Sequence, residues 1–221
     1  MTDTITILKC NYHKCRATKT FIQKEDGVIE KVKFSAGKEF THEERDISSI
    51  SDIEMLLREL QHEPQKLVIR GKPKEGIKEV GVRVCNGPLA RFVSVPRKWV
   101  MLDVDDFDFA AGLNINNDTA QIIAQMKSLL PEIFRKSKGV YKLSSSQNVG
   151  GHRDDPITNS LRCHFWFMTD VPIRDDQWKS LLKGQRAKID LSLFNPVQAH
   201  YTANPIFIGM DDPISERIGQ C

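Results

Sequence analysis

The sequence predicts an α+β domain in which a β-rich N-terminal portion packs on a core that contains a βαβ unit. Three observations support this fold class. Strand patterns occupy the first 45 residues, alternating strand and helix patterns begin at Trp99, and an apolar strand in that second part ends in two aspartates. We expect residues 1–221 to form a single domain, with an N-terminal α/β portion over 1–98 and the core over 99–221.

The N-terminal portion begins with a predicted β-hairpin. Residues 19–23 and 28–34 have the composition of strands, and they flank the pair Asp26-Gly27. Glycine tolerates the positive φ that a tight hairpin turn needs. The segment therefore predicts two strands joined by a tight turn.

A helix is predicted to begin at Ser51-Asp52-Ile53-Glu54. This is a capping-box pattern, in which the serine and glutamate side chains each satisfy a backbone N–H that has no partner within the helix. The residues that follow form one apolar stripe, made of Ile53, Leu56, Leu57 and Leu60.

A short strand and a long loop complete the N-terminal portion. Residues 65–71 predict the strand, which runs into a basic turn. Residues 72–97 are interrupted by glycine and proline and predict a loop, with one strand near 82–84.

The core begins with a predicted βαβ unit. Residues 99–105 predict a buried strand, 119–136 a helix that Pro131 is expected to kink or restart, and 139–144 a returning strand. Such a unit makes the two strands parallel, with a right-handed crossover. If the strands are adjacent, the serines at 144–146 lie near the end of the first strand.

The rest of the core continues the alternation. It contains a polar loop over 148–160, a strand over 161–168, a short helix over 175–182 and a candidate strand over 188–191.

Composition indicates a soluble protein. Apolar residues make up 40% and charged residues 28%, and the net charge of +3 is too small to indicate a polyanionic partner by itself. No apolar stretch approaches the roughly 20 residues that span a bilayer, and the N-terminus lacks a signal peptide. We expect a cytoplasmic protein that makes no membrane contact.

The five cysteines are odd in number and scattered, which argues against a disulfide framework. Cys10, His13 and Cys15 could each bind zinc. A structural zinc site has four ligands, usually in two pairs, and no second pair is present. We therefore do not expect zinc, and the alternative is that these are ordinary strand and turn residues.

Asp103 and Asp105 are the most informative residues of the chain. They follow an apolar run at positions i and i+2, so on a strand their side chains point to the same face. Two carboxylates held that close repel each other unless a cation lies between them, and a divalent metal with oxygen ligands would provide it. The alternative is an acidic loop that caps the following helix.

Three further polar residues interrupt apolar strands. His164 shares a strand face with Arg162, which suggests an anion-binding surface, although a single strand histidine is commonly structural. Asp190 lies between Ile189 and Leu191. It could cap a turn or be a third carboxylate of a metal site.

Together these segments resemble the archaeo-eukaryotic primase superfamily, the primase-polymerases. That family has an apolar strand ending in Asp-x-Asp, then a Ser-x-His element, then an apolar residue followed by Asp. The matching segments here are 101–105, 162–164 and 188–190, with Arg162 where the family has serine. The resemblance covers roughly 99–209, and 68–71 and 194–203 look like segments of primases from plasmids, phages and integrated elements.

The resemblance implies a primase-polymerase catalytic core with an RRM-like sheet, and DNA-templated nucleotidyl transfer that uses two ions of Mg²⁺ or Mn²⁺. It implies that Asp103, Asp105 and Asp190 hold the metal ions and are catalytic. The nucleotide phosphates would be bound by His164, Arg162, Ser144, Ser145, Ser146 and Lys142. Gln198, His200 and Tyr201 could contact the sugar or base.

A protein that copies a template must also bind nucleic acid, through basic side chains that contact the phosphates. The candidates are Arg70, Lys72, Lys74, Arg91 and Arg97. The implied partners are a single-stranded DNA template and an NTP or dNTP. A replicative helicase, fused or separate, is a further expected partner, and the chain would then be the N-terminal part of a longer protein or act beside the helicase.

Two other function classes stay open. A nuclease would use the same carboxylates but needs no triphosphate pocket, so Arg162 with His164 favours the polymerase. A non-catalytic nucleic-acid-binding module on the same scaffold would need none of the three aspartates.

Overall fold

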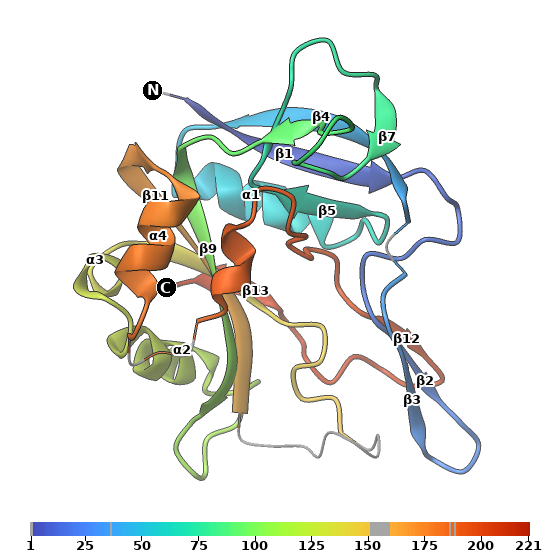
Figure 1. The fold of residues 1–221 in the computed structure, drawn as a ribbon. Helices are drawn as coiled ribbons and strands as arrows, with labels where there is room; N and C mark the ends of the chain where they lie inside the picture. The colour runs from blue at the N-terminus through green and yellow to red at the C-terminus, as the bar shows by residue number, and fades with distance from the viewer. Residues whose placement is uncertain (1, 36, 151–159, 186, 188) are drawn as a thin grey trace.

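The computed structural model describes residues 2–35, 37–150, 160–185, 187 and 189–221. The fold is α+β, as the sequence predicts, with helices packed against sheets (Figure 1). Within the described part of the chain, no helix has both the length and the apolar character needed to cross a membrane. The elements in chain order are β1 (Asp3–Cys10), β2 (Thr20–Gln23), β3 (Ile29–Val32), β4 (Glu39–Ile47), α1 (Ile50–Leu60), β5 (Lys66–Ile69), β6 (Lys72–Pro73), β7 (Val80–Val82), β8 (Phe92–Val93), β9 (Arg97–Asp108), α2 (Thr119–Ser128), α3 (Glu132–Arg135), β10 (Gly139–Leu143), β11 (Ser160–Ile173), α4 (Asp175–Leu182), the 3₁₀ helix η1 (Leu191–Phe194), β12 (Ile206–Ile208) and β13 (Ile218–Gln220).

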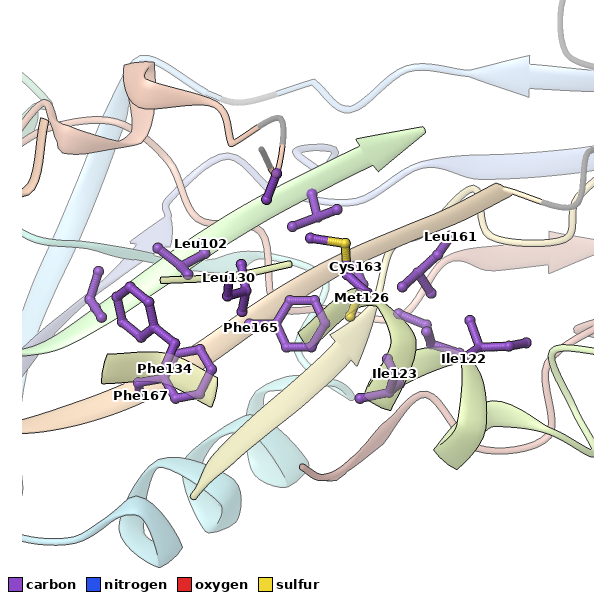
Figure 2. Packing of buried hydrophobic residues seen from close by; sticks show 14 of the residues in the cluster. Leu102, Ile122, Ile123, Met126, Leu130, Phe134, Leu161, Cys163, Phe165 and Phe167 are labelled. Carbon is purple, nitrogen blue, oxygen red and sulfur yellow. The ribbon is translucent and has the colours of Figure 1, made fainter. Parts of the chain in front are cut away.

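The central sheet has the strand order β13-β10-β11-β9, and every neighbouring pair is antiparallel. One face packs against α2, α3 and α4. Its core contains Leu102 of β9 and Phe165 of β11, which lie against Ile123 of α2 and Phe134 of α3 (Figure 2). Because strand side chains alternate, the residues between these apolar positions point to the other face.

That other face is covered by α1 and a second sheet, of order β5-β1-β4-β7. The apolar stripe of α1 is buried as predicted, and it belongs to one cluster with Ile5 and Ile7 of β1 and with Trp99, Met101 and Trp166 of the central sheet. The expected packing of a β-rich N-terminal portion on the core is therefore confirmed.

A third, three-stranded sheet extends from the body as an arm (Figure 1). It contains the predicted hairpin, β2 and β3, whose turn residue Gly27 has a φ of +80°. β12 pairs with β2 in parallel, so a C-terminal segment is joined to the hairpin. This pairing places the residues after 200 beside the N-terminal portion.

The start of α1 differs from the prediction. Its N-cap is Ser49, and the capping box is completed by Asp52 rather than Glu54. The Asp52 carboxylate accepts hydrogen bonds from the backbone N–H groups of Ser48 and Ser49, whereas Glu54 forms an ion pair with Arg58 one turn later. Asp52 completes the capping box because its short side chain reaches the backbone N–H groups directly.

The expectation that the two strands of the βαβ unit are adjacent is wrong. β9 and β10 are parallel, but β11 lies between them and is antiparallel to both. Local sequence pattern specifies that a strand exists, but the order of strands depends on which pairs bury the larger apolar surface. The 14-residue strand β11 pairs with both β9 and β10 and lies between them.

Two smaller predictions had different outcomes. The break at Pro131 is confirmed, since α2 ends at Ser128 and Pro131 caps α3. The candidate strand at 188–191 is wrong, because Ile189 makes only an isolated bridge to Val104 and η1 follows at once; residue 188 lies outside the described residues.

Candidate functional site

Asp103 and Asp105 lie on one face of β9, as predicted. Val104 between them points into the core against the helices, while both carboxylates line a pocket of about 150 Å³ on the opposite face. Asp103 is partly buried and Asp105 is exposed. The apolar run of β9 therefore places two acidic groups on one face of this edge strand of the central sheet.

The two carboxylates have opposite electrostatic environments. Although Asp105 is exposed, partial desolvation by the surrounding protein raises its pKa, and the negative charge of Asp103 raises it further. Burial also acts to raise the pKa of Asp103, but the nearby His164, with smaller effects from His200 and Lys19, lowers it overall. One carboxylate is thus held ionised, and the other carries an unfavourable charge that a cation would relieve.

His164 lies opposite Asp103 in the register of β11 and β9. Its Nε2 atom is 3.3 Å from Asp103 Oδ1. Asp103 Oδ1 and His164 Nδ1 are both buried atoms without a hydrogen-bond partner. Both groups therefore keep bonding capacity at the pocket.

A β-bulge follows this pair and changes the direction of Asp106. Asp105 and Asp106 of β9 together oppose the single residue Arg162, because the register shifts between Val104–Cys163 and Phe107–Leu161. Asp106 has a φ of +57°, and its Oδ1 is 3.2 Å from the Arg162 guanidinium. On a regular strand Asp106 would point away from this face; the bulge instead brings it to Arg162.

Two of the three serines reach the site, although the strand that they follow, β10, is not adjacent to β9 as the prediction assumed. Ser144 and Ser145 line the same pocket as Asp103 and Asp105. The hydroxyl of Ser144 is buried without a hydrogen-bond partner. Ser146 is buried, and its hydroxyl accepts a hydrogen bond from Lys19 Nζ at 3.2 Å.

Lys142 does not reach the pocket. It is only 3% exposed, and its Nζ donates a 2.6 Å hydrogen bond to Asn204 Oδ1. Burial, with repulsion from Arg217, lowers its pKa to about 7. The structure therefore gives Lys142 a buried partner in place of the predicted phosphate contact.

Asp190 lies next to Asp103 along the backbone, since its N–H donates to the Asp103 carbonyl at 3.2 Å. Its carboxylate caps η1 by accepting hydrogen bonds from the Ser192 N–H and hydroxyl groups. Among the described residues, no group of three or more His, Cys, Asp or Glu side chains is close enough together to hold a metal ion. Asp103 and Asp105 are thus assembled, and a metal-binding role for Asp190 stays a prediction.

The pocket also contains residues that the sequence did not point to. Thr18, Lys19 and Phe34 come from the N-terminal portion and line it, and Tyr201 comes from the C-terminal segment. Tyr201 had been a candidate for the sugar or base, but the other three lie more than 65 residues from Asp103 in the chain. Tertiary contacts, including those of Thr18 with Ser145 and of Lys19 with Ser146, bring the N-terminal residues to the pocket.

His200 and Gln198 are not part of the pocket lining. His200 is buried against the rings of Trp99 and Trp166, and burial lowers its pKa to about 3. The expected contact of His200 with a nucleotide is therefore replaced by packing in the core.

Three of the five residues expected to contact nucleic acid have structural partners within the protein instead. Arg70 is 1% exposed and pairs with Asp175 at 2.6 Å, and Arg97 is 2% exposed and contacts Asp3. The Arg91 guanidinium donates to backbone carbonyls of the loop at 78–80. These arginines hold loops and strands together, whereas Lys72 and Lys74 are exposed. The sequence pattern could not distinguish a surface arginine from one that is paired in the interior.

Comparison with curated proteins found a protein of Escherichia phage T5 named "Putative replication origin binding protein". The two sequences are 27% identical over 187 residues, which cover 77% of this chain and 19% of the phage protein. The chain therefore corresponds to less than a fifth of that relative's length. No family model and no solved structure matches the chain.

Proposed function

We propose that this chain carries out DNA-templated nucleotidyl transfer, making or extending a primer strand. One observation carries the proposal: Asp103 and Asp105 share a pocket with His164, Ser144 and Lys19. Carboxylates hold divalent cations, and the other three side-chain types bind phosphate oxygens. Metal-dependent transfer of a nucleotide requires both kinds of group at one place.

The residues present fit a divalent cation. Asp103 Oδ1 is a buried oxygen without a hydrogen-bond partner, and Asp105 carries a charge that its surroundings disfavour. Mg²⁺ or Mn²⁺ held there would activate a 3′-oxygen and neutralise a triphosphate. His164, the Ser144 hydroxyl and the Lys19 ammonium would bind the phosphates.

The similarity to primase-polymerases supports the same reaction. The order of Asp-x-Asp, His and a later Asp along the chain follows that family, and the structure places the first two elements side by side on β9 and β11. The name of the phage T5 relative points to replication and to DNA contact. The proposed partners are single-stranded DNA and an NTP or dNTP; a helicase partner stays a prediction.

A DNA-binding module without catalysis is the second candidate. Two observations favour it: the name of the phage relative refers to origin binding, and within the described residues the third aspartate caps η1 rather than joining the other two. Such a module would bind DNA in the same way whether or not Asp105 is charged.

The deciding experiment measures nucleotide incorporation on single-stranded DNA, with and without an annealed primer, in Mg²⁺ or Mn²⁺. The variants are Asp103→Asn and Asp105→Asn, and Asp170→Asn is the control because it changes an exposed carboxylate elsewhere on β11. We expect products from the wild type and the control and a loss of at least about 100-fold in both site variants. Cleavage of the DNA without synthesis would indicate a nuclease, and DNA binding with neither activity would indicate the binding module.

A further inference from the structure

The pocket at Asp103 and Asp105 is smaller than a nucleotide. Its volume is about 150 Å³, whereas sites that enclose a whole small molecule have about 300–1,000 Å³. A triphosphate bound to the acidic end would therefore leave its base outside, at the rim. What lies at the rim decides how the base is held.

The pocket lining includes an aromatic pair. Phe34 and Tyr201 both line the pocket, their ring centroids are 4.3 Å apart and their planes are tilted by 38°. Phe34 is 41% exposed, so part of its ring is accessible to a ligand. Tyr201 is partly buried, and burial raises the pKa of its hydroxyl to about 12, so the phenol stays neutral.

Lys19 adds a positive charge to the same pocket lining. It lines the pocket, its Nζ donates to Ser146 Oγ at 3.2 Å, and its charge contributes to the lowered pKa of Asp103. Phe34 and Lys19 flank the β2–β3 hairpin, which pairs with β12 near Tyr201. The arm therefore presents a cation and an aromatic surface together.

We infer that Phe34, supported by Tyr201, is the stacking surface for the base of the incoming nucleoside triphosphate, and that Lys19 binds its phosphates. This rests on the proposed function and extends it, because it assigns nucleotide recognition to the N-terminal portion. A base offers a π face to an aromatic ring whatever its identity, so the contact gives affinity without selecting one base. Phe34 is a positioning residue, since it touches the base and not the reacting phosphate.

The test compares two ligands, dATP and inorganic tripolyphosphate, by calorimetry on the full chain. Phe34→Ala removes the ring and is expected to weaken dATP binding about 5- to 100-fold while leaving tripolyphosphate binding unchanged. Phe34→Trp is expected to restore dATP binding. Lys19→Gln is expected to weaken both ligands. Val32→Ala is the control, because Val32 is also an exposed apolar residue and lies at the end of β3, two residues before Phe34. This variant should change the binding of neither ligand.

Three results would overturn the inference. These are unchanged dATP binding in Phe34→Ala, equal weakening of dATP and tripolyphosphate in that variant, and weakened binding of a single-stranded oligonucleotide with unchanged dATP binding. The last would assign the aromatic pair to the template strand. Incorporation assays distinguish this inference from the proposed function. If the wild type binds dATP through Phe34 but makes no product, the proposed nucleotidyl transfer is wrong and the inference that Phe34 stacks on the base still holds.

Discussion

His164 Nε2 lies 3.3 Å from Asp103 Oδ1, across directly paired residues of β11 and β9. Burial opposes the charge of Asp103, but His164, together with smaller effects from His200 and Lys19, more than offsets it and holds the pKa below the usual 3.8. Because the folded-state pKa is lowered, the ionised carboxylate stabilises the fold above about pH 4, and this contribution is lost as the pH falls through the lowered pKa.

His164→Gln should therefore raise the pKa of Asp103, since burial would no longer be offset. Carboxyl carbon chemical shifts followed by NMR against pH would report it. His62→Gln is the matched control because His62 is exposed. An unchanged Asp103 titration in His164→Gln would show that the pairing does not determine the ionisation of this carboxylate.

The buried Lys142 should make the free energy of unfolding depend on pH in the alkaline range. Its pKa is lowered from 10.5 to about 7 by burial, so the unfolded state binds one proton more than the folded state between these values. The free energy of unfolding should rise by about 2 kcal/mol between pH 7 and pH 9 relative to Lys142→Met, which has no such proton. Urea denaturation at both pH values measures this. If the free energy of unfolding changes equally in the two proteins between pH 7 and pH 9, the prediction that Lys142 is buried and neutral is wrong.

Asp190 has a capping role that can be separated from a catalytic one. Asp190→Ala removes the hydrogen bonds to Ser192 and should lower the free energy of unfolding by about 1 kcal/mol. Asparagine is as effective an N-cap as aspartate, so Asp190→Asn should leave the free energy of unfolding unchanged. If Asp190 is the third carboxylate of the reaction, the same variant should lose nucleotide incorporation. Incorporation at the wild-type rate by Asp190→Asn would leave the cap as its role.

The buried ion pair Arg70–Asp175 should be essential for stability. Arg70 is also stacked on Trp99 at 5.0 Å and donates to the Trp99 carbonyl. Asp175→Ala leaves a buried guanidinium without its counter-ion and should cost about 3–5 kcal/mol, measured by urea denaturation. Arg174→Ala breaks the neighbouring exposed pair with Asp176 and should leave the midpoint unchanged. Equal effects of the two variants would contradict the burial of Arg70.

Divalent ions should stabilise the protein through Asp105. Without metal, Asp105→Asn removes repulsion from Asp103 and should raise the melting temperature slightly. With Mn²⁺ at 100 times its dissociation constant, the wild type should gain about 5–10 °C and Asp105→Asn much less. Thermal unfolding with and without Mn²⁺ tests both statements. A wild type that is unaffected by Mn²⁺ would argue against the metal site.

The two central motifs could be predicted because both depend on local alternation. A run of apolar residues with charges at i and i+2 has one arrangement on a strand, so Asp103 and Asp105 had to share a face. The same argument placed His164 with Trp166, and both lie on the face opposite the helices. The orientation of Asp106 could not be predicted in this way, because a bulge breaks the alternation and aspartate is one of the few residues besides glycine that accept a positive φ.

The sequence by itself determined that β9 carries two carboxylates on one face, that α1 buries one apolar stripe, and that a hairpin turns at Gly27. Each depends on neighbours a few residues away. Only the tertiary structure decided that β11 separates β9 from β10, that Arg70 is buried, and that Lys19 and Phe34 reach the pocket. The reason is physical: strand order and the partners of a charged side chain depend on which distant surfaces exclude water together, and no local pattern contains that information.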